Sequence, residues 1–185
     1  MASLITLGLS QIMVGTAAPD GTMPTAALTK IGKTYKDTCK MAQDASDVTE
    51  HFEEGRSAPE VRKKAKKIPA LTFSIMDPDE AFLAKYVGGS SDAAKGWGFD
   101  GTEVVANVAL KVETEQGLDI SIPNADVEAV INADFSAKGI FLVDFTVTPC
   151  AVSSGKAIWA KAKTRSRISN YPEAPKPLFS GASLI

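Results

Sequence analysis

Hydrophobic and polar residues alternate one by one over much of the second half of the chain. Within 103–113, one side of the pattern is apolar and consists of Val104, Ala106, Val108, Leu110 and Val112. Successive side chains of a β-strand point to opposite faces, so this alternation predicts an antiparallel strand with one buried face. Turn signals at 115–117 and 138–139 interrupt the pattern. The alternation itself continues in three more segments, 118–122, 127–135 and 141–147.

Further strands are predicted on both sides of this region. They cover 3–14, 30–41, 68–76 and 155–169. The turn-rich segment 15–25 and the polar segment 42–67 lie between the early strands. Many short strands with turn signals between them are typical of a β-sandwich or barrel.

One helix is predicted at about 78–87. Asp77 suits the N-cap, Pro78 suits the first helical position, and Gly88 supplies the left-handed conformation that ends a helix. A weaker helical pattern covers 58–67, with capping-box spacing at its start and basic residues at its end.

The expected fold class is therefore mainly β: a β-sandwich or barrel with one flanking helix (about 78–87) and a long arm loop (about 42–67). A single domain is expected over 1–185. Prolines at 172, 175 and 177 favour an extended C-terminal tail over 171–185.

Composition fits one folded domain and offers little chemistry. Of the 185 residues, 44% are hydrophobic and 23% charged, close to the averages of folded proteins. Cys39 and Cys150 match no metal-ligand spacing and are expected to be buried thiols. The single histidine, His51, has no nucleophile marked by a known spacing, and the glycines of 96–101 follow a polar loop instead of a strand. We expect no enzyme, no cofactor and no metal.

The N-terminal sequence, the lengths of the apolar runs and the net charge argue against secretion, membrane insertion and general nucleic-acid binding. The first 19 residues carry no charge and lack the basic start of a secretory signal, so a first strand is expected there. No apolar run reaches the roughly 20 residues of a spanning helix, and no membrane partner is expected. The formal charge of −2 argues against a general nucleic-acid binder.

Charged residues are nevertheless distributed unevenly. Six acids and one arginine lie within 44–60, and five bases lie within 62–67. A basic row recurs at every second position near the C-terminus: Lys161, Lys163, Arg165 and Arg167. Three interpretations of this row stay open: protection of an exposed strand from unwanted pairing, a surface for an acidic partner such as a neighbouring copy, and a nucleic-acid stripe.

An acidic row is also predicted on the sheet. It consists of Asp119, Asp126, Glu128 and Asp134. Its two interpretations are an ordinary solvated sheet face and the wall of a channel, where like charge keeps a polyanion from sticking.

Two segments carry a resemblance to a known family. Residues 49–60 read Thr-Glu-His-Phe-Glu-Glu-Gly-Arg-Ser-Ala-Pro-Glu, and 68–75 read Ile-Pro-Ala-Leu-Thr-Phe-Ser-Ile. With the order of early strands, long arm, strand, single helix and further strands, the chain resembles a tail tube protein (major tail protein) of long-tailed bacteriophages.

The resemblance implies a virion protein, made in the host cytoplasm, whose copies form hexameric rings that stack into the tail tube. DNA passes through that tube without sequence recognition, after a tape-measure protein, and the tube ends on tail terminator and baseplate or distal tail proteins. The family is not enzymatic and has no cofactor. The basic row has no counterpart in the family pattern.

The resemblance also implies roles for residues. The arm would reach a neighbouring subunit or ring through Asp47, Glu50, Phe52, Glu53, Glu54, Gly55, Arg62, Lys63 and Lys64. The basic row is a candidate interface strand, and the acidic row is the candidate lumen wall.

Two alternatives remain. One is a barrel that binds a small apolar ligand, with Trp97, Phe99 and Trp159 near its mouth. The other is a different virion protein, such as a tail terminator or a capsid decoration protein.

Overall fold

The computed structural model describes residues 4–24, 26–102, 104 and 107–163. The fold is mainly β, with antiparallel sheets and one helix, as the sequence predicts. The predicted basic residues Arg165 and Arg167 and the tail 171–185 lie outside the described residues.

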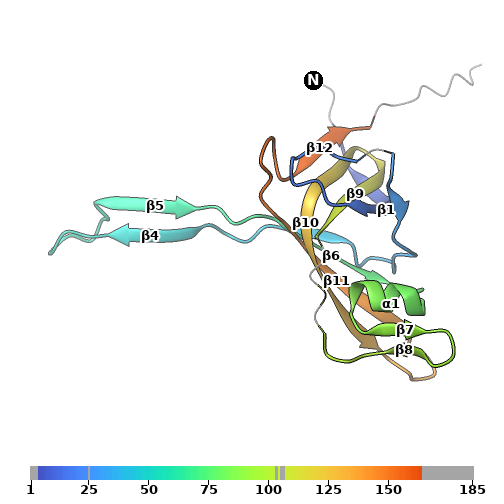
Figure 1. Ribbon diagram of the computed structural model, residues 1–185. Coiled ribbons are helices and arrows are strands. Elements are labelled where there is room, and N and C mark those ends of the chain that lie inside the picture. The colour runs from blue at the N-terminus through green and yellow to red at the C-terminus, as the bar shows by residue number, and fades with distance from the viewer. Residues whose placement is uncertain (1–3, 25, 103, 105–106, 164–185) are drawn as a thin grey trace, which may run out of the picture.

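One large antiparallel sheet forms the body of the molecule (Figure 1). Its strand order is β2-β1-β9-β10-β11-β6-β3, and β12 lies beside the first part of β10. The strands are β1 (Leu7–Thr16), β2 (Thr29–Lys30), β3 (Lys40–Ala42), β6 (Ala70–Ile75), β9 (Asn107–Gln116), β10 (Leu118–Ala133), β11 (Phe141–Pro149) and β12 (Trp159–Ala162).

The sheet rolls up because one segment hydrogen-bonds to strands from both of its halves. Ile31 N–H donates to the Ile12 carbonyl on β1 at 3.0 Å, and Tyr35 N–H donates to the Ser74 carbonyl on β6 at 2.8 Å. The predicted strand over 30–41 is therefore wrong. That segment contains only the end of β2, a crossing stretch and the start of β3.

The inward face of the rolled sheet holds the hydrophobic core. Phe73 of β6 stacks on Phe145 of β11 with ring centroids 5.0 Å apart. The apolar residues of the alternating pattern point into this core. Those that are buried on the central strands are Val108, Leu110, Val112, Ile122, Val127, Val143, Phe145 and Val147.

Strand β10 is longer than predicted, because Pro123 does not end it. The register shifts between Ile122 and Ala125, which marks a β-bulge, and a bulge tolerates a residue without a backbone N–H. The extra residue keeps Ile122 and Ala125 both on the buried side. The far end was predicted wrongly: β10 stops at Ala133, and the side chain of Phe135 is 85% exposed.

The one helix of the described residues, α1 (Glu80–Tyr86), covers one opening of the rolled sheet (Figure 1). Its N-cap is Asp79, whose carboxylate accepts from Phe82 N–H at 2.7 Å, and not Asp77 as predicted. Asp77 instead accepts from Lys33 N–H at 2.6 Å. The buried side of α1 contributes Leu83 and Tyr86 to the core.

Two small hairpins complete the described chain. The first consists of β4 (Asp47–His51) and β5 (Val61–Ala65), and the second of β7 (Ser90–Asp92) and β8 (Gly96–Gly98). The arm 42–67 is thus a β-hairpin and not a loop, and the predicted helical pattern over 58–67 is wrong because β5 occupies it. Isolated β-pairing with β4 overrides the weak helical pattern there.

Candidate assembly surfaces

The arm, residues 42–67, projects from the body as an isolated hairpin (Figure 1). Its strand partners run from Asp47 opposite Ala65 to His51 opposite Val61. β4 and β5 contact each other and no other helix or strand of the described chain. The arm therefore presents both of its faces and both of its outer edges to solvent.

Opposite charges lie on the two strands of the arm. Glu50 Oε1 is 2.7 Å from Arg62 Nε, and Asp47 Oδ1 is 3.2 Å from Lys67 Nζ. Because these pairs lie at the surface, each contributes ~0–1 kcal/mol. They join the two sides of one arm, so Glu50 and Asp47 already meet bases of the same chain. Two further predicted arm bases are exposed on β5: Lys63 and Lys64.

The tip of the arm, residues 51–60, combines an apolar side chain with acids. Phe52 is 54% exposed. Glu53 pairs with Arg56 at 2.7 Å, whereas Glu54 has no ion-pair partner among the described residues. Gly55 has φ +85° and open space where a side chain would lie, as a tight turn at a free tip requires.

The arm has no core of its own. Every residue of β4 and β5 is exposed. An isolated two-stranded hairpin is at best marginally stable in water, and exposed ion pairs add little. Contact with another molecule would bury its apolar groups and stabilise it.

The basic row is described only in part. Lys161 lies on β12 opposite Asp119, and Lys163 directly follows β12, where its backbone N–H donates to the Gly117 carbonyl at 2.8 Å. Lys163 Nζ donates to the Thr114 carbonyl and lies 3.8 Å from Asp119 Oδ1. Lys163 thus ties the end of β12 to its own sheet, although its side chain stays 40% exposed, and Lys161 is also exposed.

The acidic row does not form one continuous face. Asp126 and Glu128 are exposed two positions apart on β10. The Asp119 side chain is only 16% exposed and accepts from Thr114 N–H at 2.9 Å. Asp134 lies beyond β10 and accepts from Ser136 N–H at 2.9 Å in the following turn. The structure brings together only Asp126 and Glu128.

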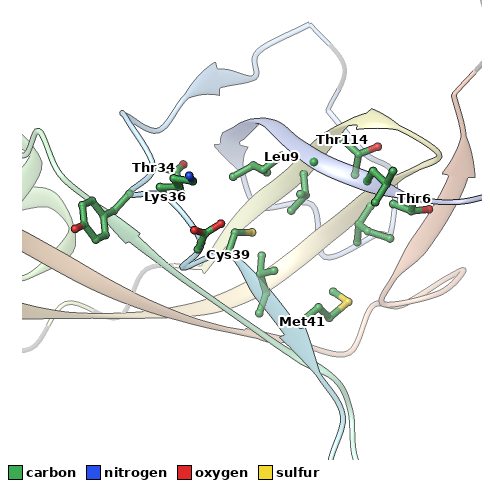
Figure 2. Close-up of a pocket in the computed structure, with 14 residues that line it drawn as sticks. Thr6, Leu9, Thr34, Lys36, Cys39, Met41 and Thr114 are labelled. Atoms are coloured by element: carbon green, nitrogen blue, oxygen red, sulfur yellow. The ribbon is translucent and has the colours of Figure 1, made fainter.

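A hollow of about 670 Å³ opens beside the base of the arm (Figure 2). Its apolar lining comes from strands β1, β3, β6, β9 and β10 and from the chain before β3: Leu7, Leu9, Cys39, Met41, Leu71, Val112 and Ile120. Sequence reasoning missed this site, because its residues come from distant parts of the chain and no local pattern links them.

Lysines lie beside this hollow. Lys36 and Asp37 line it, and Lys33 and Lys40 are exposed on the same stretch of chain. Burial raises the pKa of the Cys39 thiol, so Cys39 stays protonated at neutral pH. Cys39 and Cys150 are both free thiols, and each is only partly buried, so the expectation of buried thiols is met only in part.

The aromatic residues expected at a ligand mouth do not gather there. Trp97 and Phe99 lie 5.9 Å apart between ring centroids near β8, and Trp159 lies on β12 at the opposite end of the body (Figure 1). None of the three lines the hollow. His51 is exposed at the end of β4.

Comparison of the sequence with known protein families and with curated proteins finds no match. In the described part of the chain, no helix is long and apolar enough to cross a bilayer. No group of three or more histidine, cysteine or acidic side chains is arranged there to hold a metal ion.

Proposed function

We propose that this chain is a non-enzymatic structural subunit of a bacteriophage tail tube, in which hexameric rings of identical copies stack around a channel for DNA. The observation that carries the proposal is the charged β4–β5 hairpin of the arm, which contacts no other helix or strand of the described chain. An isolated hairpin is marginally stable in water, and contact with another molecule would stabilise it. The sequence resemblance supports the form of the assembly.

The edges of the body support the same proposal. In the described sheet, β3 pairs only with β6, and β12 pairs only with β10. Each therefore has an outer edge whose N–H and C=O groups can pair with another strand. Identical copies arranged in a closed ring turn such edges into productive contacts.

The other proposed partners follow from the same assembly. The tape-measure protein and then DNA pass through the channel without sequence recognition, and tail terminator and baseplate or distal tail proteins cover the ends. Asp126 and Glu128, which are exposed together on β10, are the proposed channel-wall residues. Negative side chains there would repel the DNA, a polyanion, and prevent it from binding to the channel wall. The proposed location is the virion tail.

Deletion of 44–66 tests the proposal. Gln43 Nε2 donates to the Lys67 carbonyl at 2.6 Å, so a short glycine turn can join the two ends of the deletion. The full-length protein is expected to form rings or tubes in electron micrographs, and the deletion variant to stay monomeric. Because β4 and β5 contact no other helix or strand in the part of the chain that the structure describes, the variant should unfold with nearly the same free energy.

The proposal is wrong if the full-length protein stays monomeric at high concentration, or if the deletion variant assembles as well as the full-length protein does. A short closed ring without further growth would instead indicate a tail terminator.

A ligand-binding barrel is the second candidate, and the apolar hollow beside β3 favours it. It predicts a monomer that binds a hydrophobic dye saturably with or without the arm.

A further inference from the structure

We propose that the arm tip of one copy docks in the hollow of another copy, with the Phe52 side chain as the anchor. The inference rests on the proposed self-assembly and names the two surfaces that meet. It commits to a second copy of this chain as the occupant of the hollow.

The apolar surfaces of the two sites match. Phe52 is a large aromatic side chain, half exposed at the tip of an arm whose two strands are exposed throughout. The hollow is lined by aliphatic and sulfur-containing side chains, with Leu7 and Met41 exposed at its margin. Its volume of about 670 Å³ exceeds that of one phenylalanine side chain, so the neighbouring tip backbone has room as well.

The charges of the two sites also match. The tip, residues 51–60, carries three glutamates and one arginine. The stretch 30–40, part of which lines the hollow, carries four lysines and one aspartate. The acidic tip of one copy and the basic margin of the hollow in another attract each other, and this attraction orients the two copies as they meet. Glu54, which has no ion-pair partner in the described chain, is the acid best placed to meet Lys36.

The arm points away from the hollow of its own chain. β3 and β6 lead directly into the arm, which extends outward from the body (Figure 1). The nine residues from 43 to 51 span about 30 Å when extended, roughly the diameter of a small domain. An arm of this length reaches the next copy.

The tip and the hollow are different surfaces of one chain. A contact between two different surfaces is heterologous, so each copy both gives an arm and receives one. Such a contact propagates from copy to copy, either around a ring or along a stack.

Site-specific cross-linking tests the docking, because Cys39 already lies in the hollow. One chain carries Phe52→Cys, Cys39→Ala and Cys150→Ala, and the second carries only Cys150→Ala. Because Phe52→Cys removes the anchor, the mixture is kept about thirtyfold above the concentration at which the unsubstituted chain associates. The two are mixed as full-length proteins with a short thiol-reactive cross-linker at mildly alkaline pH, since burial raises the pKa of Cys39. The expected product is a covalent pair that joins position 52 of one chain to Cys39 of the other, identified by peptide mass spectrometry.

The matched control carries Phe135→Cys in place of Phe52→Cys. Phe135 is the more exposed of the two phenylalanines and also lies on a turn, so random collision would label it at least as well. No cross-link from position 135 to Cys39 is expected. In the otherwise unmodified chain, Phe52→Ala should weaken association about thirtyfold, as loss of an anchoring aromatic does, whereas Phe135→Ala should leave it nearly unchanged.

Docking and tube formation give separate readouts. Tubes without a link from position 52 to Cys39 would overturn the docking and leave the tube proposal standing. The link without tubes would support the docking and overturn the tube. Monomers without the link would overturn both. A Cys39 that is already protected from alkylation in the monomer, by a small apolar molecule or by its own chain, would also overturn the docking.

Discussion

The arm and the rolled sheet are both antiparallel β-structure, yet only the rolled sheet has an interior. In the sheet, neighbouring strands curve around one core, and residues such as Phe73 and Phe145 lose contact with water. In the arm, two strands pair in regular register and every side chain stays exposed. The two regions therefore share the same kind of backbone pairing and differ in whether their side chains are buried.

The comparison shows that regular strand pairing does not by itself make a region stable. Net hydrogen-bond contributions are modest because unfolded chains bond to water, whereas burial of large apolar side chains dominates. The body has a buried core to stabilise it, whereas the strands of the arm have none. The arm is thus the part that an assembly partner would order.

The largest expected effect compares two phenylalanines. Phe145→Ala removes a ring that stacks on Phe73 and meets Tyr86, and should lower the free energy of unfolding by about 3–5 kcal/mol. Phe52→Ala should change it by no more than about 0.5 kcal/mol. Chemical denaturation of the monomers, followed by tryptophan fluorescence, measures both. Similar losses for the two variants would mean that the arm packs on the body.

A smaller effect is expected on the outer face of the rolled sheet. Glu113 accepts hydrogen bonds from Lys111 at 2.6 Å and from Gln11 at 2.7 Å, and these bonds lower its pKa below the ordinary value of 4.5. Because the folded state favours the charged form, this contribution is present above pH 4.5 and is lost as the pH falls through the lowered pKa.

Glu113→Gln should therefore cost about 1 kcal/mol at neutral pH, and the difference from the unsubstituted protein should shrink in acid. Denaturation midpoints measured from neutral to acid pH check this. A difference that grows in acid would contradict the assignment.

The smallest effect is expected in the arm. Glu50→Gln removes the exposed pair with Arg62 and should change the free energy of unfolding of the monomer by less than about 0.5 kcal/mol. Amide exchange across β4 and β5 should rise in the variant and also in high salt, because salt screens exposed pairs. Exchange in the arm that is as slow as in β10 would show that the hairpin is stable without a partner.

Local alternation predicted much of the sheet correctly because each strand there has one face in the core. Val108, Leu110 and Val112 are examples, and so are Val143, Phe145 and Val147. The same pattern failed at Phe135, since apolar spacing continues past the point where the partner strand ends. It also missed that Pro123 lies at a bulge within β10.

The sequence by itself determined the β class, the inward faces of the central strands, the existence of the helix and the separation of charge along the arm, because these depend on residues close in the chain. Only the tertiary structure decided that the crossing stretch 31–35 joins β1 to β6, that the arm pairs as a hairpin, and that residues from five segments surround one hollow. These features depend on which distant strands meet, and neither periodicity nor composition carries that information.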